Sequence, residues 1–382
     1  MVEEHVFREI PVTRSQIINC SFSSWYPKYK SHVPKSKIIK PLPHQFIDYL
    51  TSDGIQLPDD GHYQVNMGNG NDEYSDWSED EDEETEQKLR ELDSSSDESD
   101  EEDDKIQKPK KSTAEIFSEF QDIHTQIKDI IAEWGSITPK LNWSAPRDAT
   151  WIMATNTMKC ENASDVYLIL NASNYIMHDI SNAFDEVKEE NNGVEGQDDI
   201  KSTQLEMELI LRKWVSINPA LEFRVFVKNR RIIGVSQREL NYYDYLENLT
   251  STIRTLIDDF FENVLVDSFP DPDFVFDVYL PRPFDKTYLI DINPFSRTTD
   301  SQLFTWHELA GESQNKIDDV DDGEEENYQI RLVTEVNKGR FASKEHSENQ
   351  VPKDVVDASL DSNAMAELAK QWKELQTKGG ED

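Results

Sequence analysis

A long run of acidic residues interrupts this 382-residue chain and limits where a folded core can form. From Asn71 to Asp104 the sequence reads NDEYSDWSEDEDEETEQKLRELDSSSDESDEEDD, in which Asp and Glu dominate and apolar residues are scarce. Such a segment cannot bury enough apolar surface to offset the entropy cost of ordering it. We therefore predict a disordered acidic insert over residues 71–110. The folded core must come from the N-terminal segment, residues 1–70, and from the chain beyond the insert.

The formal net charge of −38 at pH 7 bears on the partners of the chain. An acidic surface repels the phosphates of nucleic acids and of anionic lipids, so we predict neither nucleic acid nor membrane as a partner. The two cysteines, Cys20 and Cys160, are too few for a disulfide framework, as is typical of a reducing compartment. The sequence has no apolar run long enough to span a bilayer and no signal-peptide pattern. We expect a soluble protein of the cytosol or nucleus that is monomeric when alone.

Two predicted strands near the C-terminal third of the chain carry a pair of aspartates. The segments Phe274 to Leu280 and Tyr288 to Phe295 are rich in aromatic and branched residues and are joined by a turn that contains proline. In a hairpin centred midway between them, Asp277 lies directly opposite Asp291 on the neighbouring strand. Asn293 then projects from the same face as Asp291.

This pair of aspartates needs a cation if the hairpin is buried. Burying two carboxylates side by side without a partner costs roughly several kcal/mol or more. Asp277, Asp291 and Asn293 offer only hard oxygen ligands, which suit Mg²⁺ with water and phosphate as its other ligands. The alternative is that this face of the hairpin is solvated and that the acids are ordinary surface residues. Spacing alone leaves both interpretations open.

A loop between Thr138 and Cys160 embeds charged residues among aromatic residues and a proline. A buried cation needs an anion. A phosphate is one candidate, with Lys140 as a point charge and Arg147 as a planar fork. The alternative is a structural salt bridge from Arg147 to Asp148 or to another neighbour.

A second predicted hairpin gathers polar residues on one face. A turn centred on Asn229 and Arg230 would place Glu222 opposite Gln237, with Arg224 diagonal to Gln237 on the same face. Polar side chains are unusual on a sheet face that packs against a core. A functional face and a solvent-facing one are both open interpretations.

The spacing of apolar residues predicts the remaining elements. The predicted helices cover residues 22–29, 44–50, 112–135 and 251–264, with a short helix near 365–375 inside an acidic, disordered tail over residues 312–382. Ser112 and Glu115 form the capping box of the third helix, and Gly135 ends it. The predicted strands, besides the first hairpin, cover residues 165–174, 206–215, 221–227 and 232–239.

The helix over residues 22–29 has two interpretations. Phe22, Trp25, Tyr26 and Tyr29 share one side of it, in the most basic part of the chain. Clustered aromatic side chains usually pack in a core. The alternative is that the rings and the surrounding lysines help residues 1–70 to dock a partner protein.

The order of these elements predicts an α+β fold, because helices and antiparallel strands follow one another without alternating βαβ units. A glycine-rich phosphate loop and a GxGxxG motif are both missing, which argues against P-loop and dinucleotide sites. Among nucleotide-binding folds that lack such loops, the ATP-grasp architecture fits. It holds ATP between two α+β halves, which we assign to residues 111–205 and 206–311, the second with the magnesium site.

Several longer motifs carry a closer resemblance. They are CSFSSWYPKYK, PKLNWSAPRDATWI, ELILRKWV, EFRVFV, GVSQRE, FVFDVYL, LIDINPF and TDSQLFTW. Through them the chain resembles, from about Pro11 to Leu309, the cell division cycle protein 123 family, ATP-grasp proteins that assist assembly of eukaryotic translation initiation factor 2. The resemblance implies an ATP–Mg²⁺ site and binding to the gamma subunit of that factor, which promotes its union with the alpha and then the beta subunits. Together with the composition, it implies a cytoplasmic location.

The resemblance also implies roles for single residues, matched motif by motif. Lys140 and the loop that follows it resemble the element that covers the phosphates, and Arg212 to Trp214 resemble the hinge that lines adenine. The implied ATP contacts are Lys140, Asn142, Trp143, Ala145, Arg147, Asp148, Arg212, Lys213, Trp214 and Arg224, and the implied Mg²⁺ ligands are Asp277, Asp291 and Asn293. The alternative to an assembly factor is an ATP-grasp carboxylate–amine ligase that acts through an acyl phosphate.

Overall fold

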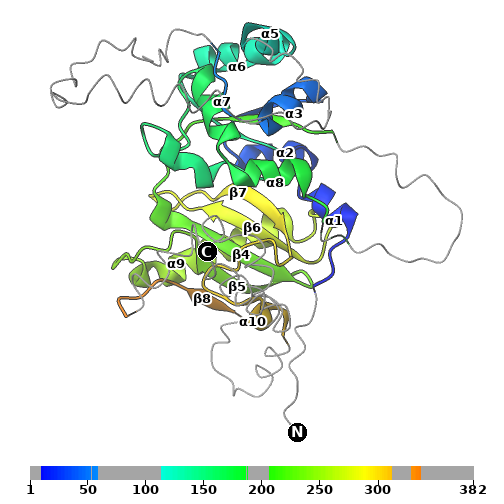
Figure 1. Cartoon of the computed structure of the whole chain (residues 1–382). Helices are drawn as coiled ribbons and strands as arrows, with labels where there is room; N and C mark the ends of the chain where they lie inside the picture. Colours follow the sequence, from blue (N-terminus) through cyan, green and yellow to red (C-terminus); the bar gives the residue numbers. More distant parts are fainter. Residues whose placement is uncertain are drawn as a thin grey trace, which may run out of the picture.

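The computed structural model describes residues 10–52, 54–58, 113–185, 187, 206–311 and 328–336 (Figure 1). Within these ranges the chain forms a three-stranded sheet in the order β1-β3-β2 and a five-stranded sheet in the order β7-β6-β4-β5-β8. Helices pack against both sheets, so the predicted mixture of helix and antiparallel sheet is confirmed. The division into two ATP-grasp subdomains stays a prediction.

The smaller sheet is antiparallel throughout, with its central strand last in sequence. It consists of β1 (Ser36–Ile39), β3 (Leu209–Lys213) and β2 (Ile137–Lys140). Its helices are α3 (His44–Thr51), α5 (Thr113–Ser118), α6 (Gln121–Trp134), α7 (Ala163–Asn171) and α8 (Asn174–Ser181). Phe46, Ile127 and Tyr167 are fully buried between these helices and the sheet. Each such side chain contributes about 1.5–3 kcal/mol through its burial.

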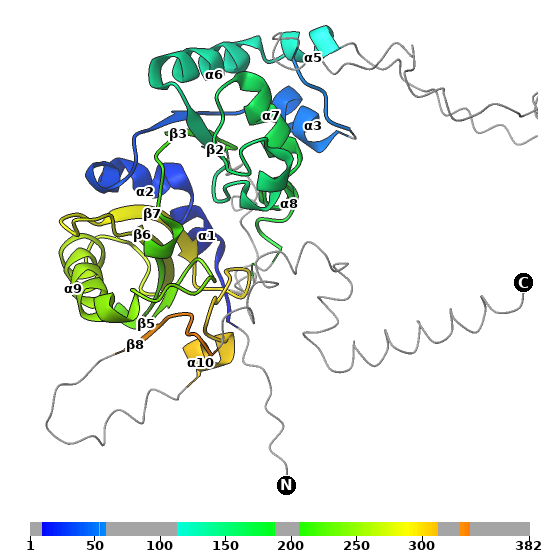
Figure 2. The ribbon, with the colours of Figure 1, turned by 90° about the vertical axis from the view of Figure 1, so that its left-hand side faces the viewer.

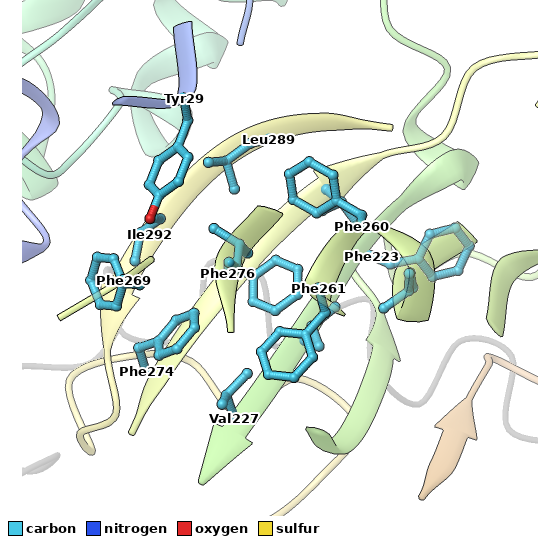
Figure 3. Close-up of a cluster of buried hydrophobic side chains, with 14 of the residues drawn as sticks. Tyr29, Phe223, Val227, Phe260, Phe261, Phe269, Phe274, Phe276, Leu289 and Ile292 are labelled. Atoms are coloured by element: carbon cyan, nitrogen blue, oxygen red, sulfur yellow. The ribbon is translucent and has the colours of Figure 1, made fainter. Parts of the chain in front are cut away.

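The larger sheet is built around the two predicted hairpins. Its strands are β7 (Tyr288–Pro294), β6 (Phe274–Tyr279), β4 (Glu222–Lys228), β5 (Arg231–Gln237) and β8 (Gln329–Arg331). Helix α9 (Thr250–Phe260) continues as one turn of π-helix (Phe261–Leu265) and covers one face of this sheet. Helix α10 (Trp306–Ala310) lies between β7 and β8 in the sequence. Figure 3 shows the aromatic cluster under α9, in which Phe261 stacks on Phe276 at 6.1 Å between ring centroids.

The N-terminal helices α1 (Arg14–Asn19) and α2 (Phe22–Tyr29) join the two sheets (Figure 2). On the side of the small sheet, the Phe22 amide donates to the Asn142 carbonyl at 2.8 Å. On the side of the large sheet, the Tyr29 and Ser268 hydroxyls lie 2.8 Å apart. Because Phe22, Trp25 and Tyr26 are at most 5% exposed, their interpretation as core is confirmed, and their rings offer no surface for docking. Docking by other parts of residues 1–70 stays a prediction.

The predicted strand over residues 165–174 is wrong, because this segment is helix α7. Asn162 caps the helix: its side chain accepts from the Asp165 amide, and the Asp165 side chain accepts from the Asn162 amide. The short run VYLIL is apolar or aromatic throughout and therefore has no period that separates a buried helix from a buried strand. The local capping signal decides in favour of the helix.

The predicted single helix over residues 112–135 is two helices, α5 and α6, which is a second correction. Phe120 leaves the helical region with φ −133° and ψ 37°, which breaks the hydrogen-bond ladder between them. The prediction that Gly135 ends the segment is confirmed, since it adopts φ +81°, a conformation that favours glycine. Ser112, and with it the capping box, lies outside the described residues.

The register predicted for β4 and β5 is also wrong by one residue. Near the turn the pairs are as expected, but a bulge between Phe226 and Val227 shifts the rest. Phe223 therefore faces Gln237, and Arg224 faces Ser236. A bulge inserts one unpaired residue, and the sequence pattern did not reveal it.

Part of the tail that was predicted to be disordered is a strand. β8 pairs in parallel with β5, and Val333 just beyond it is 1% exposed. The acidic insert and the short terminal helix near residues 365–375 lie outside the described residues. Among the helices that the structure describes, none is long and apolar enough to cross a membrane.

Candidate functional site

The predicted hairpin of the two aspartates forms, although its pairs next to the turn are shifted by one residue and a bulge between Asp277 and Val278 restores the expected pairing. β6 and β7 pair in an antiparallel register that places Asp277 directly opposite Asp291. Asp277 is 1% exposed, and the Asp291 side chain is 16% exposed. The interpretation that both acids are ordinary surface residues is therefore wrong, and their charges need partners within the protein or from a ligand.

Two arginines bind Asp277. Arg224 on β4 donates from Nε and Nη2 to the two carboxylate oxygens, each at 2.8 Å, and Arg238 donates from Nε at 3.1 Å. Burial alone would lower the pKa of Arg224, but the adjacent Asp277 carboxylate more than offsets this and raises it. The paired fork is a strong, directional contact, so Arg224 is fixed in place and permanently charged.

Lys140 binds Asp291 and comes from the other sheet. Its Nζ lies 2.8 Å and 2.9 Å from the two carboxylate oxygens, although Lys140 stands on β2 of the small sheet. The side chain is only 1% exposed, and this burial lowers the pKa of Lys140 while Asp291 acts against the shift. The predicted need for an anion near Lys140 is met here by a carboxylate.

A third buried acid, Glu222, links the loop after β2 to the large sheet. Arg147 and Arg238 each approach Glu222 Oε2 at 3.3 Å. Burial is the main cause that raises the pKa of Glu222. Of the alternatives for Arg147, the structure supports an ion pair with a distant residue, not with its neighbour Asp148.

Arg212 and Asn293 each bury a polar atom that has no partner in the described structure. Arg212 on β3 donates from Nη2 to the Ile290 carbonyl at 2.6 Å, while its Nε is buried without a hydrogen bond. The Nδ2 of Asn293 is buried without a partner as well. Leaving a buried donor unpaired costs about 1–3 kcal/mol, so both atoms are free to donate to a ligand.

The remaining predicted site residues lie around this cluster with contacts of their own. Asn142 bonds to the backbone of Glu206 and Glu208, and Trp143 donates from Nε1 to the Ile17 carbonyl. Asp148 accepts from the Ser173 hydroxyl and the Asn174 amide at the start of α8. Ala145 is half-buried, Trp214 is half-buried and Lys213 is exposed. The structure therefore brings Lys140, Arg147, Arg212, Arg224, Asp277, Asp291 and Asn293 together, and gives Asn142, Trp143 and Asp148 structural contacts.

Sequence reasoning missed two members of the cluster. Arg238 binds both Asp277 and Glu222, and Glu222 was assigned to a polar sheet face but to no site. The signal for Arg238 was its position in the GVSQRE motif directly after β5, next to the strand that carries Arg224. The bulge in β5 concealed which side chains of the two strands lie together.

The fit of this cluster to a metal ion rests on few ligands. Among the described residues no three His, Cys, Asp or Glu side chains gather in a way that would hold a metal by themselves. Asp291 and Asn293 fit Mg²⁺ best, because an amide can turn its oxygen towards a metal in place of its unpaired nitrogen. Mg²⁺ usually takes one or two carboxylates and completes its shell with water and phosphate. Asp277 already binds two arginines and fits less well.

Comparison with known proteins decides the family. The model of the D123 family matches residues 25–359. The chain belongs to the D123 family. It is 51% identical to "Cell division cycle protein 123" of Candida glabrata over 98% of this chain and 96% of that one. It is 48% identical to the "Translation initiation factor eIF2 assembly protein" of Vanderwaltozyma polyspora, over 97% and 94%.

A solved structure supports the fold of this family member. Cdc123 from Schizosaccharomyces pombe is 31% identical and superimposes with a TM-score of 0.57 over 85% of this chain and 100% of that one. The expected membership of the cell division cycle protein 123 family is therefore confirmed, and the mixed helix and sheet fold is the fold of a Cdc123 structure.

Proposed function

We propose that this D123-family protein binds ATP with Mg²⁺ and acts as an assembly factor for eukaryotic translation initiation factor 2. The observation that supports it most is the convergence of cations from both sheets on one pair of aspartates: Lys140 from the small sheet and Arg224 from the large one. A triphosphate needs such a set of buried, directed positive charges. Two relatives that are 48% and 50% identical to this chain bear the name translation initiation factor eIF2 assembly protein, which supports the assembly role.

The chain's own residues would divide the work of holding the nucleotide. Lys140 and Arg212 would bind phosphate oxygens. Arg224, whose Nε and Nη2 bind Asp277 and whose Nη1 donates to the Asp300 carbonyl, would attract the phosphates by its charge. Asp291 and Asn293 would hold Mg²⁺, which when bound would neutralise the charge of the triphosphate. In this structure the Lys140 ammonium group binds both oxygens of Asp291. We therefore expect Lys140 to move from Asp291 to a phosphate oxygen when Mg²⁺ and ATP bind.

The proposed partner is the gamma subunit of the initiation factor, and the proposed setting is the cytoplasm, where translation begins. ATP and Mg²⁺ would hold the two sheets in one relative position, so that a protein-binding surface takes its final shape. Turnover of ATP is not required for this role, because a ligand shifts a conformational equilibrium by binding alone.

The test of nucleotide binding is calorimetry of the full chain with ATP, with and without Mg²⁺. We expect Mg²⁺-dependent binding to the parent protein and its loss in Asp291→Ala, because the remaining ligands cannot hold the ion against its hydration. The matched control is Asp285→Ala, which removes an exposed aspartate from the turn of the same hairpin. Parent-like affinity in Asp291→Ala would remove the site from this hairpin.

The test of the partner is co-elution of the full chain with the purified gamma subunit in size-exclusion chromatography, with and without ATP and Mg²⁺. We expect a complex that is stabilised by the nucleotide in the parent protein and not in Asp291→Ala. Absence of a complex at micromolar concentrations in the presence of ATP would contradict the proposed partner but not the nucleotide site.

A further inference from the structure

Two cations of the cluster lie over the same aromatic ring. The Nζ of Lys140 is 5.4 Å from the centroid of Phe22, and the guanidinium carbon of Arg212 is 5.0 Å from it. Both distances are within the range in which a cation is attracted to the face of a ring. Phe22 itself is 0% exposed, so water does not screen these contacts.

The ring of Phe22 is held rigidly by its surroundings. It stacks on Tyr26 with 4.8 Å between centroids and meets the edge of Trp25 at 4.7 Å. The Phe22 amide also bonds to the Asn142 carbonyl, two residues beyond Lys140. The face of the ring is therefore fixed relative to the strand that carries the lysine.

The two cations need such a support because they repel each other. Arg212 is among the causes that lower the pKa of Lys140, while Asp291 raises the pKa of both cations, together with Asp179 for Lys140 and Glu222 for Arg212. Two like charges this close to one another repel, and a group that attracts both helps to hold them in place. An aromatic face does so without supplying a hydrogen-bond acceptor that would compete with a phosphate.

We propose that Phe22 is a positioning residue whose ring face holds Lys140 and Arg212 together as a preformed site for the phosphates of the nucleotide. This inference rests on the proposed ATP binding. It assigns a role in that site to helix α2, whose residues carry none of the predicted ligands. The competing explanation is that Phe22 only fills space in the core.

Fluorinated phenylalanines at position 22 separate the two explanations, because fluorine withdraws electrons from the face of the ring and changes its size little. We expect calorimetry to show ATP affinity falling stepwise from phenylalanine through the 4-fluoro and 3,5-difluoro to the 3,4,5-trifluoro ring, by about tenfold in total. Affinity for AMP should fall less, since it presents fewer charges to the cations. Unchanged ATP affinity across the series would overturn the proposal.

The matched control is the same series at Phe46. This ring is also 0% exposed, but its neighbours are the aromatic rings of Tyr49, Phe120 and Tyr167. Substitution there should leave ATP affinity unchanged. An equal loss at Phe46 would assign the effect at Phe22 to general packing.

Thermal unfolding without nucleotide tests the ring separately from the proposed function. In the parent chain we expect the midpoint to fall with each fluorine at position 22, and in Lys140→Met we expect a smaller dependence, because one cation is gone. Equal slopes in the two backgrounds would show that the ring does not hold the lysine. If the parent protein fails to bind ATP at all, the proposed function fails, while these slopes still decide whether Phe22 holds the cation.

Discussion

Some side chains of the site use all their polar atoms in contacts within the fold, and others keep a polar atom that is unpaired among the described residues. Asp148 uses one carboxylate oxygen for the Ser173 hydroxyl at 2.6 Å and the other for the Asn174 amide at 2.7 Å. Both contacts satisfy groups at the beginning of α8, where a helix needs acceptors. Asn293 is different, because its buried Nδ2 has no partner in the described structure. The Asp148 carboxylate is therefore used by contacts within the fold, whereas the Asn293 amide is available to a ligand.

We therefore predict that Asp148→Asn acts on stability and not on the nucleotide. The amide loses one acceptor and the charge near the helix start, so the free energy of unfolding should fall by about 1 kcal/mol in urea denaturation. ATP affinity in calorimetry should change less than about twofold, which is below 0.5 kcal/mol. Asp165→Asn, which changes the capping carboxylate of α7, is the control and should behave alike. A tenfold loss of ATP affinity with parent-like stability would instead make Asp148 a ligand.

The pairing of Asp277 with Asp291 agrees with the prediction from the midpoint of the hairpin, although a bulge beside Asp277 was needed to restore that register. Their cations were not predictable in the same way. Arg224 reaches Asp277 from a strand 53 residues earlier, and Lys140 reaches Asp291 from the other sheet, 151 residues earlier. Such pairs depend on how whole sheets are placed, and sequence spacing carries no information about that.

At the scale of elements, β8 is a strand within an acidic tail, and side-chain contacts attach it to the large sheet. Arg331 donates to both oxygens of Glu308, to the Leu303 carbonyl, and lies over the ring of Phe304. The amide of Val333 donates to the Gln237 side chain at 3.0 Å. On the other side of β8, the Tyr328 hydroxyl donates to Asp258 at 2.7 Å, so the attachment combines the pair of Arg331 and Glu308 with a short parallel ladder and with buried contacts at both ends.

This attachment should weaken in acid. The hydrogen bond and charge of Arg331 lower the pKa of Glu308 from 4.5 to about 2, so the pair stabilises the fold above pH 4.5 and is lost as the pH falls towards 2. Because the Glu308 side chain is 43% exposed, the effect should be local and small. Hydrogen exchange at the Val333 amide, corrected for intrinsic rates, should accelerate between pH 5 and about 3. Glu308→Gln should exchange fast at both pH values; equal protection at both pH values in the parent would contradict the prediction.

Elements with an unambiguous period were predictable, and those without one were not. Helix α9 and the hairpin of β6 and β7 follow their patterns closely. Helix α7 is apolar on nearly all sides, and β8 is too short to show alternation within an acidic region. In both cases tertiary contacts and one local cap decide the structure, and pattern alone does not contain them.

At the scale of the whole molecule, the two sheets meet through helices α1 and α2 and through three side-chain contacts. These are Lys140 with Asp291, Arg147 with Glu222, and Arg212 with the Ile290 carbonyl. The described chain stops at residue 58, after α3, and resumes at α5, and both of these helices pack with the small sheet. Within the described ranges, neither α3 nor α5 supplies any of these contacts between the two sheets.

We predict that deletion of residues 71–104 leaves nucleotide binding intact. ATP affinity should stay within about twofold of the parent value, because loop length affects stability only weakly and the ligands lie elsewhere. The thermal unfolding midpoint, measured on the same samples, should change by about 2 °C at most. A large loss of thermal stability would mean that the insert packs against the body of the protein.

The order of strands in the small sheet has a consequence for synthesis on the ribosome. β1 and β2 form its two edges, and both pair with β3, which begins only at Leu209. A nascent chain that has emerged through residue 181 therefore carries both outer strands and the described helices of this sheet but lacks the central strand. The apolar surfaces of these elements stay exposed until Leu209–Lys213 has been synthesised. A pause of the ribosome before that point would prolong this exposure, and a stop codon there would release a polypeptide prone to aggregation.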